Sequence, residues 1–165
     1  MADDILIHIG TKTEKYRALL PQLKALTQGE TDLIANLANI TAALKAQFGW
    51  LWIGFYLVRE EELVLGPFQG PIACTRISKG RGVCGAAWQR METILVPDVS
   101  KFPGHITCSG LSRSEIVVPV IRNGKVVAVL DADSEAPDNF DETDKQYLGA
   151  MLEGIVFDSG ETGAV

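Results

Sequence analysis

The sequence predicts an α+β domain in which helices at both ends of the chain pack on a central antiparallel sheet. Three observations support this: helical spacing of apolar residues near both ends, strand-like runs between them, and short turn signals that join neighbouring runs. The chain has 165 residues, 47% of them hydrophobic, which suits one core that folds without disulfides or metal. We therefore expect one domain over residues 1–165, with an ordered core over about 12–157 and a frayed polar tail over 158–165.

Amphipathic helices are expected at both ends of the domain. Apolar residues recur at helical spacing over residues 12–28 and again over 33–44, and Thr31 is the expected N-cap of the second helix. A third stretch of this kind covers residues 142–157 and follows Asp141, a suitable N-cap. The apolar faces of these helices would cover the sheet.

Two hairpins supply most of the expected sheet. Residues 50–58 are rich in aromatic and β-branched side chains, and a charged turn separates them from a short apolar run at 63–65. Later in the chain, an Asn-Gly pair joins two strand-like segments, residues 115–121 and 125–131. This pair is a strong hairpin signal, because both residues readily adopt the backbone conformation of a tight turn.

The segments between the hairpins are less regular. A glycine-rich stretch leads to a short predicted helix at residues 86–90 and a strand at 94–96. Residues 99–114 show no periodicity and contain two glycines and a proline, which predicts a long loop. A long loop in a compact domain usually indicates function or mobility.

Acidic residues gather on the second hairpin. Asp131 and Asp133 are two residues apart on a strand and so point to the same face. A three-residue turn would place Glu115 opposite Asp131, which adds a third carboxyl to this face. A two-residue turn would pair Glu115 with Ala132 and send it to the other face, unless Pro119 introduces a compensating bulge. The residues leave both registers open, and a solvated strand end is the competing interpretation of the pair.

Aromatic residues on the first hairpin indicate a candidate binding wall. Trp52, Gly54 and Tyr56 share one face, and the missing side chain at Gly54 would leave a gap between two rings. Such a gap would suit a small apolar or partly cationic group. The competing interpretation is an aromatic core strand packed by helices.

The charge balance excludes some partners. The net charge is −6, the isoelectric point is near 4.9, and no run of Lys or Arg occurs. A basic surface is what binding to phosphates requires. We therefore expect no nucleic-acid partner and no membrane association.

The three cysteines, Cys74, Cys84 and Cys108, are expected to be thiols. Their spacing is too wide for the paired arrangement of a zinc site, and His8 and His105 offer little help, so no metal site is predicted. No secretory signal is evident, which predicts a cytoplasmic protein whose compartment keeps cysteines reduced. A buried or incidental cysteine is the competing interpretation for each.

Six blocks of sequence occur together in a familiar order: W-I-G-F-Y-L at 52–57, L-G-P-F-Q-G at 65–70, G-R-G-V-C-G at 80–85, G-H-I-T-C at 104–108, S-E-I-V-V-P at 114–119 and L-D-A-D-S at 130–134. With these blocks the chain resembles the free methionine-(R)-sulfoxide reductases, a catalytic branch of the GAF-domain fold. The resemblance runs from about residue 29 to 156, so it implies a single GAF-like domain.

The resemblance implies a role for each matched residue. It makes Cys108 the nucleophile and assigns Cys74 and Cys84 to resolution or recycling. It also favours the three-residue register of the second hairpin. Two further groups match the family's pocket: the aromatic residues against the substrate's S-methyl end, and the acids. These are Trp52 and Tyr56, and Glu115, Asp131 and Asp133.

The implied activity is reduction of free L-methionine-(R)-sulfoxide to L-methionine, a function in oxidative stress. A thiolate and a protonated carboxyl must face the same S=O group, because a sulfoxide sulfur is a poor electrophile until its oxygen is protonated. Attack would leave a sulfenic acid on Cys108, which an intramolecular disulfide would then replace. No bound cofactor is expected, thioredoxin is the implied reductant, and analogy of fold predicts a homodimer through the N-terminal helices.

The alternative is a non-catalytic GAF module that senses a small ligand or a redox state through its thiols. Such sensors usually come attached to output domains, and this chain has no room for one. A sensor and an enzyme differ in whether the thiols are consumed as methionine appears.

Overall fold

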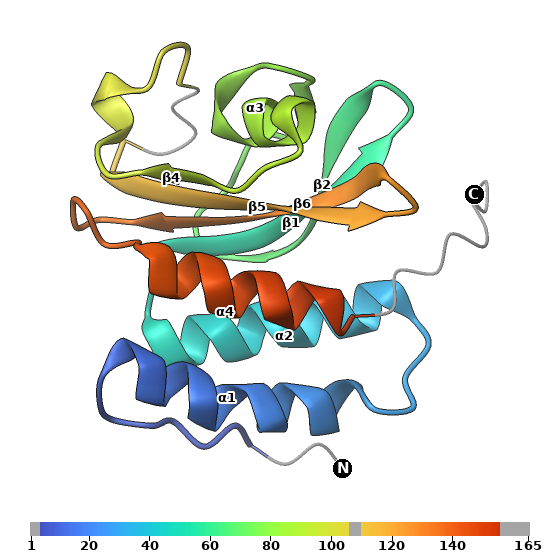
Figure 1. Cartoon of the computed structure of the whole chain (residues 1–165), viewed down its shortest axis with the longest axis vertical. Coiled ribbons are helices and arrows are strands. Elements are labelled where there is room, and N and C mark those ends of the chain that lie inside the picture. The colour runs from blue at the N-terminus through green and yellow to red at the C-terminus, as the bar shows by residue number, and fades with distance from the viewer. Residues whose placement is uncertain (1–3, 106–109, 156–165) are drawn as a thin grey trace.

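The computed structural model of the chain describes residues 4–105 and 110–155. A six-stranded antiparallel sheet forms the central layer, with α2 and α4 on one face, α1 beneath them, and α3 with several loops on the other face (Figure 1). This confirms the predicted α+β class. No helix in the described ranges has the length and apolar character that a membrane crossing requires.

The strands follow the order β3-β2-β1-β6-β5-β4 across the sheet. Both predicted hairpins are present, as β1/β2 and β5/β6, and β1 also pairs with β6. The bounds of the strands are β1 (Trp52–Arg59), β2 (Glu62–Gln69), β3 (Arg76–Ser78), β4 (Ile94–Val96), β5 (Ser114–Arg122) and β6 (Lys125–Ser134). The two hairpins therefore meet in the middle of the sheet.

The helices begin and end where side chains cap them. Thr11 caps α1 (Lys12–Thr27), whereas the predicted cap Thr31 of α2 (Leu33–Phe48) is wrong. Asp32 caps it instead, because its carboxylate accepts the N–H of Ala35, three residues on. Asp141 caps α4 (Glu142–Glu153) as predicted, but this helix ends before residue 157.

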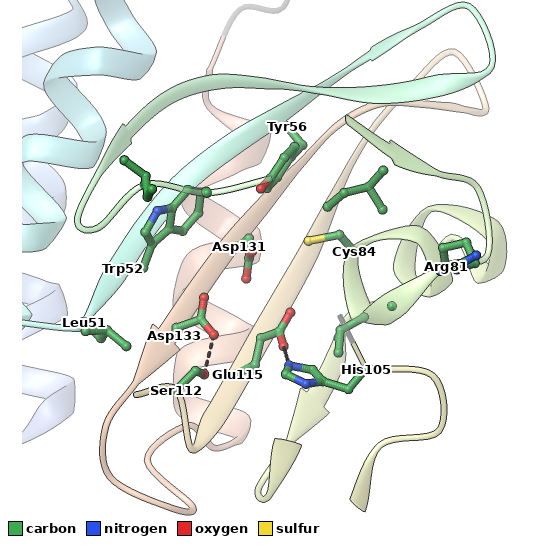
Figure 2. Close-up of a pocket in the computed structure, with 15 residues that line it drawn as sticks. Leu51, Trp52, Tyr56, Arg81, Cys84, His105, Ser112, Glu115, Asp131 and Asp133 are labelled. Atoms are coloured by element: carbon green, nitrogen blue, oxygen red, sulfur yellow. Dashed lines mark hydrogen bonds and ion pairs between the residues drawn. The ribbon is translucent and has the colours of Figure 1, made fainter. Parts of the chain in front are cut away.

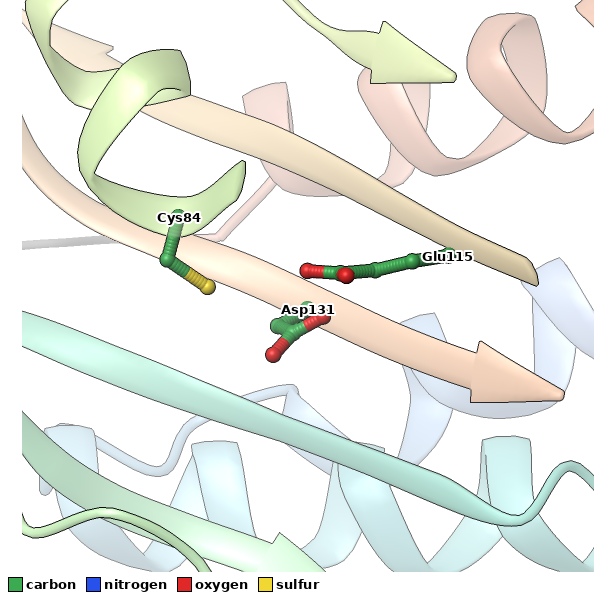
Figure 3. A group of neighbouring side chains, drawn as sticks. All are labelled: Cys84, Glu115 and Asp131. Carbon is green, nitrogen blue, oxygen red and sulfur yellow. The ribbon is translucent and has the colours of Figure 1, made fainter. Parts of the chain in front are cut away.

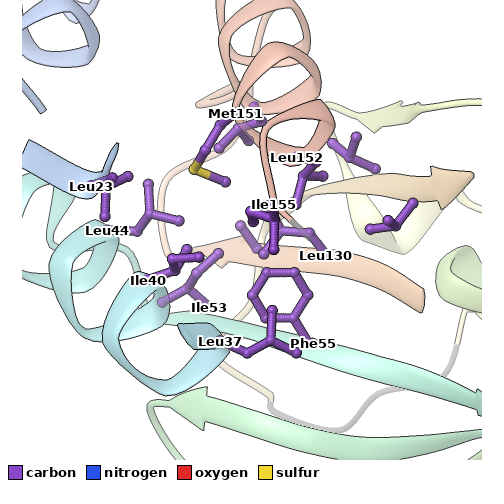
Figure 4. Close-up of a cluster of buried hydrophobic side chains, with 14 of the residues drawn as sticks. Leu23, Leu37, Ile40, Leu44, Ile53, Phe55, Leu130, Met151, Leu152 and Ile155 are labelled. Atoms are coloured by element: carbon purple, nitrogen blue, oxygen red, sulfur yellow. The ribbon is translucent and has the colours of Figure 1, made fainter. Parts of the chain in front are cut away.

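The main core lies between the helices and one face of the sheet. Alternate residues of β1 and β6 point to this face and pack against the apolar sides of α2 and α4 (Figure 4). The buried side chains labelled there are Leu23, Leu37, Ile40, Leu44, Ile53, Phe55, Leu130, Met151, Leu152 and Ile155. The remaining residues of these strands consequently face α3.

The register of the second hairpin differs from the favoured prediction. The turn has two residues, Asn123 and Gly124, both with positive φ, so the favoured three-residue turn is wrong. An irregularity between Val120 and Ile121 then shifts the pairing by one residue, so that Glu115 lies opposite Asp133 rather than Ala132. Because of this bulge, Glu115 points to the same face of the sheet as Asp133. Without the bulge, the two-residue turn would have sent Glu115 to the other face.

The opposite face of the sheet is covered by α3 (Gly82–Arg90), which begins four residues earlier than predicted. Gly85 allows this helix to lie close to the chain, since a Cβ there would come within 2.5 Å of the Ser78 carbonyl oxygen. A short 3-10 helix, η1 (Val99–Lys101), follows β4. The helix α3 and these loops enclose a second cluster of buried side chains that includes Cys84.

Candidate active site

A pocket lies between α3 and the face of the sheet formed by β1, β6 and β5 (Figure 2). The empty space in and around this pocket, including its open mouth, is about 580 Å³. Three of the polar side chains that line it are acidic, and its apolar part is aromatic and aliphatic. The lining consists of Leu51, Trp52, Tyr56, Ile72, Ala73, Ile77, Arg81, Gly82, Val83, Cys84, His105, Ser112, Glu115, Asp131 and Asp133.

Three carboxyl groups meet in this pocket. Asp131 and Asp133 come from β6, and the register places Glu115 of β5 directly opposite Asp133. All three side chains point into the same space (Figure 2). Glu115 is only 6% exposed and Asp131 only 7%, so the prediction of three acids on one face is confirmed and the solvated strand end is wrong.

Burial makes these acids hold their protons. It raises the pKa of Glu115 well above its usual value, and repulsion from Asp133 adds to the rise. Burial likewise raises the pKa of Asp131, with further repulsion from Asp133 and Glu115. Oδ1 of Asp131 is buried and has no hydrogen-bond partner among the described residues. These carboxyl groups therefore keep their protons to a higher pH than exposed ones do.

Asp133 lies in a more polar part of the pocket. Burial raises its pKa, whereas a hydrogen bond donated by Ser112 Oγ to Asp133 Oδ1 and the nearby His105 oppose the rise. Nε2 of His105 also lies 3.5 Å from Oε2 of Glu115. The three acids consequently have unequal surroundings, which is the condition for different roles in proton transfer.

An aromatic wall faces the acids, but it differs from the predicted gap. Gly54 leaves no empty space, because the ring of Trp52 lies over it: a Cβ there would come within 2.4 Å of Trp52 Cη2 and 2.5 Å of Phe68 Cβ. Trp52 stacks on Tyr56, with centroids 5.9 Å apart, and on Phe68, with centroids 5.4 Å apart. The rings form one continuous wall, whose position is fixed where Trp52 Nε1 donates to the Pro71 carbonyl oxygen.

The cysteines have different surroundings. Cys84 lies on α3, is buried, and is a free thiol. Its pKa is raised by burial and, further, by the charges of Asp131 and Glu115. Cys74 is disulfide-bonded, and its carbonyl oxygen accepts the hydroxyl of Tyr56 at the edge of the aromatic wall. The predicted nucleophile Cys108 lies outside the described residues.

Sequence reasoning missed three polar residues of the pocket, Arg81, His105 and Ser112. His105 was set aside although it stands in the G-H-I-T-C block, which was itself a signal that it lies near the site. Ser112 carried no signal, because its contact with Asp133 spans 21 residues of sequence and depends on the fold. The pocket can thus donate a proton to a polar oxygen while it holds an apolar group against Trp52.

The chain is similar to known proteins over most of its length. A family model described as GAF domain matches residues 27–157. GAF domain-containing protein A of Dictyostelium discoideum is 61% identical, with 92% of this chain and 97% of that protein covered. The free methionine-R-sulfoxide reductase of Escherichia coli (strain K12) is 46% identical, with 86% of each covered. The X-ray structure of free methionine-R-sulfoxide reductase from Neisseria meningitidis in complex with its substrate is 54% identical, with a TM-score of 0.90 over 93% of this chain and 92% of that one.

Proposed function

The chain belongs to the GAF-domain family and, within it, to the free methionine-R-sulfoxide reductases, and we propose that it reduces free L-methionine-(R)-sulfoxide to L-methionine with Cys108 as nucleophile. It is an oxidoreductase. The observation that carries the proposal is the pocket in which two buried acids and a half-buried one, all with raised pKa values, face one aromatic wall.

The acids supply the proton that the reaction needs. Sulfoxide oxygen leaves sulfur only when it is protonated or strongly hydrogen-bonded, so the donor must be neutral near physiological pH. Glu115 and Asp131 meet this condition, because burial raises the pKa of each. The carboxyl that stays ionised would bind the ammonium group of the substrate. This requirement explains a preference for the free amino acid over a methionine within a peptide.

The aromatic wall would hold the other end of the sulfoxide. Trp52 and Tyr56 present an apolar surface that suits an S-methyl group. The hydroxyl of Tyr56 is already bonded to the Cys74 carbonyl oxygen, so its ring is fixed before the substrate binds. The wall and the acids together would orient the S=O bond toward the proton donor.

The proposed chemistry has two thiol steps. The Cys108 thiolate attacks the sulfoxide sulfur while a carboxyl protonates the oxygen. The S–O bond of the substrate then breaks as the hydroxyl group transfers to the Cys108 sulfur, so methionine leaves reduced and Cys108 is oxidised to the sulfenic acid. A thiol then attacks this sulfenic sulfur and water departs, which leaves a disulfide. A dithiol reductant of the thioredoxin type restores both thiols by exchange and is itself oxidised.

Cys74 is the better candidate for the resolving thiol. It is disulfide-bonded in the structure, and the sequence contains only Cys84 and Cys108 besides it. Cys84 is a free, buried thiol whose pKa is raised by burial. A thiol of this kind forms little thiolate and reacts slowly. We therefore propose a Cys74–Cys108 disulfide, with Cys84 in a secondary recycling role.

The cellular setting belongs to the proposal as well. We propose a cytoplasmic enzyme without bound cofactor, recycled by thioredoxin and assembled as a homodimer through its N-terminal helices. The sensor alternative has less support, because relatives from Escherichia coli and Saccharomyces cerevisiae, 46% and 42% identical, are named as reductases. Loss of thiol titre with racemic methionine sulfoxide, as methionine appears, would separate an enzyme from a sensor.

The decisive experiment replaces Cys108. The Cys108→Ser variant should lose reduction of free methionine-R-sulfoxide while it stays folded, and the S epimer should be a poor substrate of the unchanged enzyme. Turnover by Cys108→Ser would reject the assignment of the nucleophile.

With thioredoxin as reductant, Cys74→Ser should complete one turnover per enzyme and then stall. Sustained cycling of this variant would assign the resolving role to Cys84.

A further inference from the structure

We propose that Cys84, Glu115 and Asp131 form a binding site for Zn²⁺, and that an ion bound there inhibits the enzyme. The inhibitory consequence rests on the proposed function, whereas binding of the ion does not. The three side chains come from α3, β5 and β6, and the thiol and both carboxyl groups turn toward one another (Figure 3).

The distances suit a small cation. Sγ of Cys84 and one carboxylate oxygen each of Glu115 and Asp131 all lie within 4.8 Å of one another. A tetrahedral zinc ion, with bonds of about 2.3 Å to sulfur and about 2.1 Å to oxygen, needs ligand atoms roughly 3.5 Å apart. The side chains would therefore have to move by only about 1 Å, which rotation of a carboxyl group can supply.

The carboxyl group of Asp131 is hydrogen-bonded to Cys84 and Glu115, yet one of its oxygens keeps unused bonding capacity. Oδ1 of Asp131 is buried and has no hydrogen-bond partner within the described residues. Buried polar atoms in folded proteins are almost always paired, so an orphaned oxygen usually indicates an absent partner or a functional group. A cation would supply this partner, and it would also relieve the repulsion among the three acids.

The donor set selects the kind of ion. Calcium and magnesium prefer oxygen ligands alone, whereas zinc readily combines a thiolate with carboxylates. His105 lies beside the cluster, with Nε2 3.5 Å from Oε2 of Glu115. It lies outside the group of three ligand atoms, so a water molecule would take the fourth position.

The proposal departs from the absence of a metal site predicted from sequence spacing. That prediction relied on the short intervals of zinc motifs whose paired ligands share one loop. Here the ligands lie at positions 84, 115 and 131, and the sheet and α3 bring them together. Ligands that lie so far apart in the sequence give no short spacing by which a zinc site could be recognised.

Bound zinc would block the proposed reaction for two reasons. The ion would take Glu115 and Asp131 as ligands, so neither could donate a proton to the sulfoxide oxygen. It would also occupy the space between the acids and the aromatic wall. Protons and zinc compete for the same three groups, so the affinity for zinc should rise with pH.

The test uses a full-length variant with one thiol. The chain has three cysteines, so Cys74→Ser/Cys108→Ser retains Cys84 alone and is inactive under the proposed function. We expect one Zn²⁺ per chain by calorimetry, and with Co²⁺ the absorption bands of a tetrahedral thiolate complex. Adding Cys84→Ser should abolish the thiolate band and weaken zinc binding at least tenfold. Adding Asp131→Asn should weaken it similarly, and circular dichroism should show that each variant is folded.

The outcomes separate the metal site from the reductase activity. No zinc binding by the one-thiol variant, or zinc binding whose affinity Cys84→Ser or Asp131→Asn leaves unchanged, would overturn the site. In the unaltered enzyme, zinc should raise the apparent KM for methionine sulfoxide, and binding without inhibition would overturn the inhibitory role alone. If the unaltered enzyme has no reductase activity, the proposed function fails while the binding result still decides the metal site.

Discussion

Buried carboxylates lie on both sides of the sheet, and they differ in how their charges are satisfied. Asp144 on α4 is 0% exposed, yet it accepts bonds from Lys12 Nζ at 2.5 Å, the Tyr16 hydroxyl at 2.8 Å and the Asp141 N–H at 2.9 Å. Asp131 is almost as buried, but one of its oxygens has no partner among the described residues, and its neighbours are acids.

The difference indicates what each group does. The bonds from Lys12 to Asp141 and Asp144 connect the starts of α1 and α4, which are more than 120 residues apart in sequence. These bonds therefore stabilise the fold. The Asp131 group leaves hydrogen-bonding capacity unused and holds protons that solvent would remove. A buried acid that is fully paired serves structure, whereas one left unpaired in a pocket is available to a ligand.

The largest expected contrast is in activity. Asp131→Asn should lower kcat/KM for free methionine-R-sulfoxide by about 10²–10⁴-fold, because a proton donor or its partner is lost. Asp144→Asn, the same change on the other side of the sheet, should leave kcat/KM per folded molecule within about twofold. Steady-state kinetics of both variants test this. Equal losses would show that the two groups do not differ in function.

The second contrast is in stability. Lys12→Met should lower the free energy of unfolding by roughly 1.5–3 kcal/mol, because it leaves buried Asp144 without its charged donor. Lys24→Met, near the exposed end of the same helix, should cost less than about 1 kcal/mol. Denaturant unfolding followed by circular dichroism measures both. A similar cost for the two variants would mean that the Lys12–Asp144 pair adds little to stability.

Much of the pocket could be predicted from the sequence, because it depends on alternation along single strands. The side chains of β1 and β6 alternate between the two faces of the sheet, and this placed Trp52 with Tyr56 and Asp131 with Asp133 correctly. The position of Glu115 depended on the number of residues in a turn and on a bulge. Its face was predicted correctly, through a register that is wrong.

The rest depends on packing that no local pattern encodes. Whether Gly54 leaves a gap is decided by the ring of Trp52, which lies over it. The Lys12–Asp144 pair joins the two ends of the chain, and the contact of Ser112 with Asp133 requires the loop to return to the sheet. These contacts form only when distant segments are brought together by folding, so the periodicity of the sequence does not predict them.

A smaller contrast is expected in the pH dependence of stability. The pKa of Glu115 is raised by burial, so the folded state binds its proton more tightly than the unfolded chain does. Stability therefore falls as pH rises from the unfolded value, about 4, through the raised pKa of the folded state. Glu115→Gln removes this cost and should stabilise the protein by about 1 kcal/mol at pH 8. Near pH 4 the gain should vanish.

The control for this prediction is Glu92→Gln, a matching change at an exposed side chain. Its melting temperature should follow that of the unaltered protein across the pH range, because an exposed carboxyl gains little from neutralisation. Thermal unfolding between about pH 4 and 8 measures both variants. A Glu115→Gln variant that is less stable at pH 8 than the unaltered protein would show that the carboxylate is paired and stabilising.

The smallest expected effect distinguishes the acids within the pocket. Ser112 Oγ donates to Asp133 Oδ1 and opposes the rise of the Asp133 pKa that burial causes, so Ser112→Ala should raise this pKa further. If Asp133 must be protonated, the alkaline limb of the kcat/KM profile moves to higher pH; if it must be ionised, the acidic limb moves to higher pH. Ser100→Ala removes a similar hydroxyl, which donates to Asp98 outside the pocket, and should move neither limb. An unchanged profile for Ser112→Ala would exclude Asp133 from the rate-controlling proton transfers and leave them to Glu115 and Asp131.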